Sequence, residues 1–322
     1  MRVRPTLIAL ALIAPASLLL ALAVGSSDVT VSALWSLLRS EATPFERLVV
    51  LDLRLPRALA AFGTGALLAL SGALLQVLLR NPLADPYVLG VSGGAAVGAL
   101  LVMLLGLSGA LVPPAAFVGA LGSTLLVFGL AQAAGAWAPE RLILTGVVIA
   151  AGWGALISLI LSLSPDTDLP AMLYWLMGDV GQGATPWPAL GMTLLVLVLA
   201  LPLGRSLNIL ARGGLQAEVL GVSVRGLEWA VYLLASLATA VAVTTAGAIG
   251  FVGLVVPHML RLLIGNDQRL LLPASALLGG SLLTLADTLA RTVIAPEQLP
   301  VGVITAMLGV PVFLYLLYRS RA

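Results

Sequence analysis

Long apolar runs separated by short polar connections make up most of the chain. A helix needs about 20 mostly apolar residues to cross the hydrocarbon core of a membrane, and most of the runs are close to that length. The pattern therefore predicts an all-α polytopic membrane protein, a single domain over residues 1–322 with about ten transmembrane helices. The expected spans are 5–25, 57–79, 89–108, 110–134, 140–163, 186–204, 228–250, 251–266, 271–292 and 300–318.

The first run, about 5–25, has two interpretations. Arg2 and Arg4 give a basic start, and the "ALA" at 21–23 resembles a signal-peptide cleavage site. The apolar stretch from Thr6 to Val24 is longer than the roughly 7–15 apolar residues of a signal peptide. We therefore expect a retained first helix, with a cleaved signal peptide as the alternative.

Three connections are long enough to hold structure. The outer loop 26–56 contains "VSALWSLL", which predicts a short amphipathic helix. The outer stretch 165–187 contains "MLYWLM", which favours a short helix at the membrane interface, where aromatic side chains are common. The inner loop, about 205–227, is the longest connection expected on the inner side.

Arginine placement predicts the orientation, because positive charge accumulates in cytoplasmic loops. With the N-terminus inside, the inner segments hold eleven arginines and the outer segments five, which places both termini in the cytoplasm. The inner ones are Arg2, Arg4, Arg80, Arg141, Arg205, Arg212, Arg225, Arg261, Arg269, Arg319 and Arg321; the outer ones are Arg39, Arg47, Arg54, Arg57 and Arg291.

Composition narrows the possible chemistry. The chain is 60% hydrophobic and only 9% charged, so lipid is its expected surrounding, and the net charge of +2 gives no sign of a nucleic-acid partner. With no cysteine and one histidine, zinc and iron–sulfur sites built on those residues are excluded. All 16 basic residues are arginine, so a P-loop, which needs a lysine, is excluded as well.

Small residues recur inside the runs, as in "GVSGGAAVGALL" at 90–101. Gly90, Gly94 and Gly98 are spaced four apart, which is typical of close helix packing in membranes. A phosphate-binding loop is disfavoured, because no strand precedes these glycines.

Few charged side chains fall within the predicted spans. Asp287 and Arg291 are four apart near the outer end of the ninth helix, so they form either a structural pair or a docking charge. His258 follows Pro257, which would fit a first helical turn or kink a longer helix. We expect a neighbouring backbone group to satisfy His258, and we read Asp166 and Asp168 as a solvated turn rather than a metal site.

The stretch "RNPLADPYVLG" at 80–90 predicts a rigid inner turn. Arg80 ends a helix, where a positive charge suits the helix dipole. Pro82 disfavours a helical conformation at Asn81, and Pro86 can begin the next element. From these residues alone, a connector is favoured over a gate.

Several motifs together resemble the FecCD family of ABC-importer permeases. They are "DLRLPRALAAFGTGALLALSGALLQ" at 52–76, "RNPLADPYVLGVSGGAAVGA" at 80–99, "MLYWLMGD" at 172–179, "GAIGFVGLVVPHMLRLLIGNDQRLLLPASALLGG" at 247–280 and the segments "LADTLAR" and "LPVGVITAMLGVPVFLYLL" within 285–317. They cover most of residues 50–318 in the family's order, whereas the first 50 residues carry no such motif.

The resemblance implies a type II ABC-importer permease in the bacterial cytoplasmic (inner) membrane. It implies a homodimer with two cytoplasmic ATPase subunits, which would bind ATP and Mg²⁺, and an external substrate-binding protein. This chain is expected to bind no cofactor or metal and to catalyse no covalent reaction. The implied cargo is an iron chelate (a siderophore complex or haem) or cobalamin, moved by alternating access.

The resemblance also implies roles for individual residues. Those expected to dock the binding protein are Arg54, Arg57 and Arg291. The expected inner gate comprises Asn81, Pro82 and Leu83. The residues expected to couple to the ATPase are Arg212, Gly213, Gly214, Ala217, Glu218, Leu220 and Gly221. Those expected to line the pathway are Thr305, Ala306 and Gly309.

Two positions depart from the family pattern. The coupling motif commonly carries an acid where Gly214 stands, and Glu218 is not expected to replace it. Pro139 and Glu140 occupy the second inner gate, where the family's vitamin B12 importer permease has small hydroxyl residues. The rival function is an ion-coupled secondary transporter, which would need a charged or broken-helix site at the bilayer midplane. The expected charges lie near helix ends instead.

Overall fold

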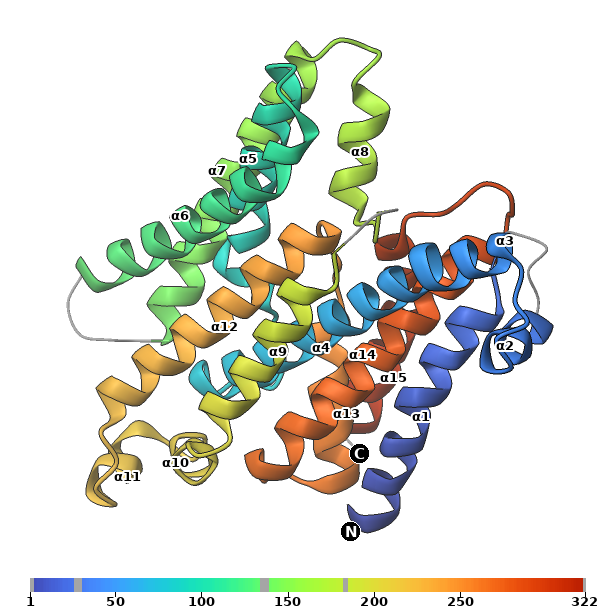
Figure 1. Ribbon diagram of the computed structural model, residues 1–322. Helices are drawn as coiled ribbons and strands as arrows, with labels where there is room; N and C mark the ends of the chain where they lie inside the picture. Colours follow the sequence, from blue (N-terminus) through green and yellow to red (C-terminus); the bar gives the residue numbers. More distant parts are fainter. Residues whose placement is uncertain (1–2, 26–30, 134–138, 182–184, 321–322) are drawn as a thin grey trace.

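The computed structural model describes residues 3–25, 31–133, 139–181 and 185–320, and within these ranges all of its regular secondary structure is helical. Ten helices match the ten predicted runs (Figure 1). They are α1 (Val3–Ala23), α4 (Leu55–Leu78), α5 (Val91–Leu104), α6 (Val112–Ala133), α7 (Pro139–Leu163), α9 (Trp187–Ala200), α12 (Val224–Ala246), α13 (Val252–Ile264), α14 (Gln268–Thr292) and α15 (Val301–Ser320).

Length and composition divide these helices into three groups. Six segments of the described chain are long and apolar enough to cross a membrane by themselves: Val3–Ala23, Pro44–Leu78, Gly109–Ala133, Pro139–Leu163, Val224–Ala246 and Gln268–Thr292. Together, α9 and α10 (Gly204–Leu210) are long and apolar enough for a seventh span, but the chain bends by 73° between them. The remaining three, α5, α13 and α15, are shorter apolar helices. The prediction of an all-α polytopic protein is confirmed.

Short helices occupy the connections. The helix predicted from "VSALWSLL" is α2 (Val31–Leu38). It is followed by α3 (Pro44–Arg47) and by a π-helical stretch, Leu48–Arg54, that continues into α4. The "MLYWLM" segment lies in α8 (Leu169–Met177). In the inner loop, α10 is followed by α11 (Gly214–Val219). Short 3₁₀ turns, Pro86–Leu89 and Gly109–Leu111, precede α5 and α6.

The core of the bundle is built around α4, nearly all of whose residues from Ala58 onward are buried. It packs against α14, α12, α13 and α9, while α5, α6 and α7 form a second group that α12 joins to the first. The close approach depends on glycine: a Cβ at Gly72 would overlap the backbone of Gly253, and one at Gly65 would overlap that of Gly279. Such small-residue contacts replace hydrophobic exclusion inside a membrane.

Packing also explains the glycines before and within α5. A Cβ at Gly94 would overlap the carbonyl of Gly119, and one at Gly98 would overlap that of Ala115, so both face α6. Gly90 has a positive φ of 70° and caps the start of α5. The packing interpretation of these glycines is therefore confirmed.

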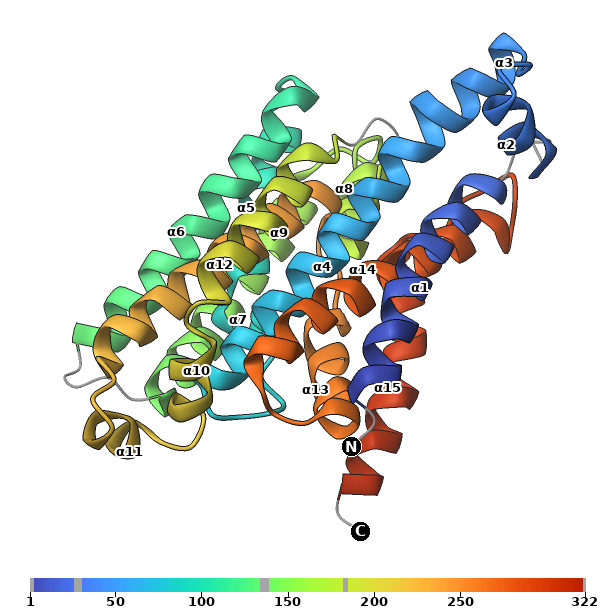
Figure 2. The ribbon, with the colours of Figure 1, turned by 60° about the horizontal axis from the view of Figure 1, so that its bottom comes forward.

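The two ends of the bundle differ in character (Figures 1 and 2). The start of α1 and the end of α15 lie at the same end as α10 and α11, whereas α2, α3 and α8 lie at the opposite end. Both termini are thus on the side of the predicted inner loop, as the arginine distribution requires. α1 packs against α14, while its retention in the mature protein stays a prediction.

Candidate functional site

Three regions of the described chain are candidates for function: an outer charge cluster around Asp287, an inner elbow at residues 80–83, and the segment α10–α11. The outer cluster centres on Asp287 near the end of α14, a residue only 1% exposed. Arg57, from the first turn of α4, donates to both Asp287 carboxylate oxygens, with its Nε at 3.1 and 3.2 Å and its Nη2 at 2.9 Å from Oδ1. Its Nη1 donates to Gln298 Oε1 at 2.8 Å, and Nη2 lies 3.4 Å from Asp179 Oδ1.

Arg291 completes the cluster from the same face of α14. Its Nε donates to Asp287 Oδ2 at 3.1 Å, so one carboxylate serves two guanidinium groups. The predicted pairing of Asp287 with Arg291 is confirmed. Asp179, in the loop after α8, is less enclosed; burial raises its pKa, and the neighbouring Arg57 opposes that shift.

Arg54 lies beside this cluster and donates from Nη1 to the carbonyl of Leu22 at 2.7 Å, which links the outer end of α1 to the start of α4. All three arginines assigned to docking are buried: Arg54 is 4%, Arg57 5% and Arg291 5% exposed. Any acid of a binding protein would have to reach guanidinium groups that already have intramolecular partners. Their docking role stays a prediction.

The inner elbow begins where α4 ends. Arg80 adopts a left-handed conformation with φ 49°, its N–H donates to Val77 O at 3.2 Å, and the N–H of Asn81 donates to Gln76 O at 3.2 Å. These two bonds form a Schellman motif, which satisfies carbonyls at a helix C-terminus. Asn81 Oδ1 then accepts from the N–H of Leu83 at 2.9 Å, which closes the turn.

Gln76 holds this elbow to α13, a role that the sequence analysis missed. Its Nε2 lies 3.3 Å from Ala84 O, 3.4 Å from Gly253 O and 3.3 Å from Leu254 O. Pro257 is the sixth residue of α13, deeper than a first turn, and its missing N–H leaves the Gly253 carbonyl without its helical donor. Gln76 compensates for that loss, and its Oε1 accepts from Arg261.

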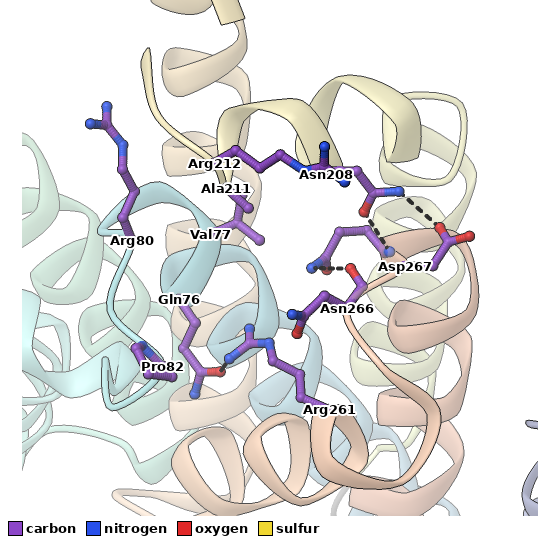
Figure 3. A pocket seen from close by; sticks show the side chains of 11 residues that line it. Gln76, Val77, Arg80, Pro82, Asn208, Ala211, Arg212, Arg261, Asn266 and Asp267 are labelled. Carbon is purple, nitrogen blue, oxygen red and sulfur yellow. Dashed lines mark hydrogen bonds between the residues drawn. The ribbon is translucent and has the colours of Figure 1, made fainter. Parts of the chain in front are cut away.

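A polar cavity of about 620 Å³ opens beside the elbow (Figure 3). On its far wall, Asn208 of α10 donates to Asp267 Oδ1 at 2.9 Å and accepts from the N–H of Gln268 at 2.8 Å, which ties α10 to the start of α14. Hydrogen bonds from Arg269, then from Asn208, hold the pKa of Asp267 well below its usual range. The lining residues are Gln76, Val77, Arg80, Pro82, Asn208, Ala211, Arg212, Arg261, Asn266, Asp267 and Gln268.

Exposed apolar side chains distinguish α11. Leu215 is 83%, Val219 87% and Leu220 66% exposed, whereas Gly214 and Ala217 face inward. The helix ends in a second Schellman motif, in which Gly221 has a positive φ of 79°. A small element this exposed and this apolar, at the end of the bundle, is typical of a partner-binding surface.

The remaining predicted residues lie as follows. Arg212 and Glu218 are exposed, and Gly213, with a φ of 138°, precedes α11. Thr305 and Gly309 line an apolar cavity of about 210 Å³ between α13, α14 and α15, and Ala306 is half-buried. Pro139 is the first residue of α7, and Glu140 is exposed.

The expectation for His258 was wrong. It is 7% exposed, and neither ring nitrogen has a hydrogen-bond partner among the residues that the structure describes. The carbonyl of Leu254, one turn before it, is contacted by Gln76 instead. In the described ranges, no group of three or more His, Asp or Glu side chains is placed to hold a metal ion.

Comparisons with known proteins agree across almost the whole chain. The model of the FecCD transport family matches residues 11–319. The chain is 41% identical to a haemin transport permease of Yersinia pestis, over 94% of both proteins. It is also 41% identical to a vitamin B12 import permease of Vibrio vulnificus, over 88% of this chain and 86% of that protein. A metal-chelate type ABC transporter in an inward-facing conformation superposes with a TM-score of 0.85 at 32% identity, covering 97% and 98% of the two chains.

Proposed function

The chain belongs to the FecCD transport family and is a transmembrane permease subunit of an ABC importer, and we propose that its cargo is a large metal chelate, which is either cobalamin or an iron chelate such as haem. The observation that carries the cargo class is the equal identity, 41%, to a haemin permease and to a vitamin B12 permease. Both of those cargoes hold a metal in a wide macrocycle.

The protein is a multi-pass component of the bacterial cytoplasmic membrane and is not itself an ATPase. The 322 residues contain no lysine, so the P-loop that binds nucleotide phosphates has to come from another subunit. ATP and Mg²⁺ would bind there. Proteins of this kind act with an ATPase and a substrate-binding protein.

We place the ATPase contact on α11. The exposed Leu215 and Val219 supply an apolar contact surface, and Asn208 anchors the preceding α10 to α14. A displacement of α10–α11 would therefore be transmitted to the bundle through hydrogen bonds as well as packing. Two ATPase subunits would contact two copies of the permease, with membrane lipid covering the remaining apolar faces.

The proposed cycle is alternating access. ATP binding and hydrolysis in the partner move α10–α11, and the elbow at Asn81, Pro82 and Leu83 opens or closes the inner exit. The binding protein delivers the chelate to the outer end, close to the Arg57–Asp287 cluster. Thr305, Ala306 and Gly309 on α15 would border the pathway once two copies meet.

Reconstitution tests this function. The permease, its ATPase and its binding protein are placed in liposomes, and uptake of haem and of cobalamin is followed with and without internal or external ATP. We expect uptake only with ATP on the ATPase side and with the binding protein outside. Uptake that needs neither and follows a proton or sodium gradient would instead establish the secondary transporter, which no comparison supports.

Paired substitutions test the ATPase contact. Leu215→Ser with Val219→Ser should weaken assembly with the ATPase, because both side chains are exposed in the isolated permease and their loss opens no cavity. The melting temperature of the permease alone should stay unchanged. A matched control is Leu233→Ser, which alters an exposed apolar side chain on α12. Undiminished ATPase binding by the paired variant would place the contact elsewhere.

A further inference from the structure

Arg80 lies at the junction between the segment α10–α11 and the inner elbow. It lies directly before Asn81, and its left-handed backbone belongs to the Schellman motif that shapes the turn. Its Nη2 lies 3.5 Å from Oε1 of Glu228, in the first turns of α12. Glu228 is 3% exposed, whereas the Arg80 side chain is 35% exposed.

Gly214 brings α11 to the same guanidinium group. It is the first residue of α11 and is buried, and a Cβ built there would lie 3.0 Å from Arg80 Nη2. A carboxylate at position 214 would therefore meet Arg80. The chain has no side chain to offer at this position, and Glu218 points into solvent on the same helix.

We propose that Glu228, through its carboxylate contact with Arg80, is a positioning residue for coupling. The proposal rests on the proposed function, because it concerns how movement of α11 reaches the elbow. The Arg80 guanidinium lies between the start of α11 and Glu228, so a displacement of α11 toward it would move the guanidinium group. The backbone of Arg80 passes that displacement to Asn81 and Leu83.

The charge on Glu228 strengthens its contact with Arg80. A carboxylate that is almost fully buried loses its hydration, so its attraction to a nearby guanidinium is much less screened than at the surface. A neutral amide in its place would keep the shape and the packing but would lose the charge-assisted contact. The effect should therefore appear in coupling before it appears in folding.

Glu228→Gln in the complete reconstituted importer tests the role, with ATP hydrolysis and uptake measured together. We expect chelate uptake per ATP hydrolysed to fall about tenfold, the scale of one lost charge-assisted contact. The ATPase should still assemble with the variant. Arg80→Gln removes the same contact from its exposed side, and it provides the same readout if Glu228→Gln does not fold.

Relocating the charge is the sharper test. Gly214→Asp in the Glu228→Gln background returns a carboxylate to Arg80, and an acid is favourable in the first turn of a helix. We expect it to restore uptake per ATP to within about twofold of the unaltered protein, and the rescue should vanish when Arg80→Gln is added. Gly226→Asp is the matched control, since it adds the same charge at an exposed position of α12 and should rescue nothing.

Two results would overturn the proposal. One is normal uptake per ATP in both Glu228→Gln and Arg80→Gln. The other is rescue by Gly226→Asp as good as that by Gly214→Asp, which would reflect net charge alone. Either result leaves the importer function standing, because the unaltered protein would still take up chelate with ATP.

Discussion

Asp287 should be the most stability-critical side chain of the outer cluster. It is 1% exposed, and its two oxygens accept hydrogen bonds from both Arg57 and Arg291. Asp287→Asn keeps the shape of the side chain but leaves the buried guanidinium groups of Arg57 and Arg291 without the carboxylate that they share. The nearest remaining carboxylate is that of Asp179, 3.4 Å from Arg57. Removing one partner of a buried ion pair costs about 3–5 kcal/mol.

Arg291→Gln is the informative comparison. It removes one of the two cations, but Asp287 keeps the forked contact with Arg57, so no buried charge is left unpaired. The cost should be that of a single charged hydrogen bond, about 1.5–3 kcal/mol, and nearer the lower value because the amide of the shorter glutamine side chain is still a hydrogen-bond donor. Asp287→Asn should therefore be the more destabilising change by about 1.5–3.5 kcal/mol.

The assay is the free energy of unfolding in lipid bicelles, with Asp166→Asn as the control because Asp166 is exposed in an outer turn. The double variant Asp287→Asn with Arg291→Gln completes a double-mutant cycle and should recover part of the loss. If Asp287→Asn cost no more than Arg291→Gln, the carboxylate would not be shared as the distances indicate, and the reasoning would fail.

Three further outcomes are expected. Gly72→Val should lower the yield of folded protein or its melting temperature sharply, whereas Gly122→Val, with nothing within 4 Å of its Cβ position, should not; equal effects would reject the packing argument. Gln76→Leu should cost about 1–3 kcal/mol in unfolding experiments, because the Gly253 carbonyl near Pro257 loses its donor; a neutral result would mean that another donor takes over. Asp267 has a folded-state pKa below the unfolded value of about 3.9, so its contribution to stability is present at neutral pH and is lost as the pH falls below about 4. Asp267→Asn should flatten that part of the plot of unfolding free energy against pH, and an unchanged plot would count against this role of Asp267.

Much of the fold could be predicted from the sequence, because lipid as a solvent leaves few options for the backbone. Each of the ten apolar runs became a helix. The helices also end at the expected breaks before α6 and before α13, although no charged residue marks either break. The bend between α9 and α10 was not predicted: "LPLGRSL" reads as the end of a helix, and nothing in it fixes the 73° angle. That angle depends on how α10 packs and hydrogen-bonds to α14.

The site was harder to predict, because its polar contacts join residues that are far apart in sequence. The i,i+4 spacing was enough to identify the Asp287–Arg291 pair, but Arg57 reaches Asp287 across 230 residues. Gln76 was missed, although a glutamine near the inner end of an apolar helix, just before a proline turn, was a usable signal. Glu228 was not singled out, because it stands at the start of the predicted span 228–250. Its burial against Arg80 is a property of the folded chain.

His258 shows the limit of reasoning from residue type alone. A lone buried histidine usually finds a backbone partner, yet here a proline one residue earlier has already changed the hydrogen bonding of the helix. Gln76 of α4 contacts both the Gly253 carbonyl, which Pro257 leaves without a helical donor, and the Leu254 carbonyl. Only the packing of α4 against α13 could reveal those contacts.

ATP-driven chelate uptake tests the account most directly. Liposomes containing the permease and its ATPase, given the chelate-loaded binding protein outside, should accumulate haem or cobalamin only when ATP is available to the ATPase. Uptake per ATP should drop in the Leu215→Ser, Val219→Ser variant. Accumulation that continues without ATP, or without the ATPase subunit, would contradict the assignment of this chain as an ABC-importer permease.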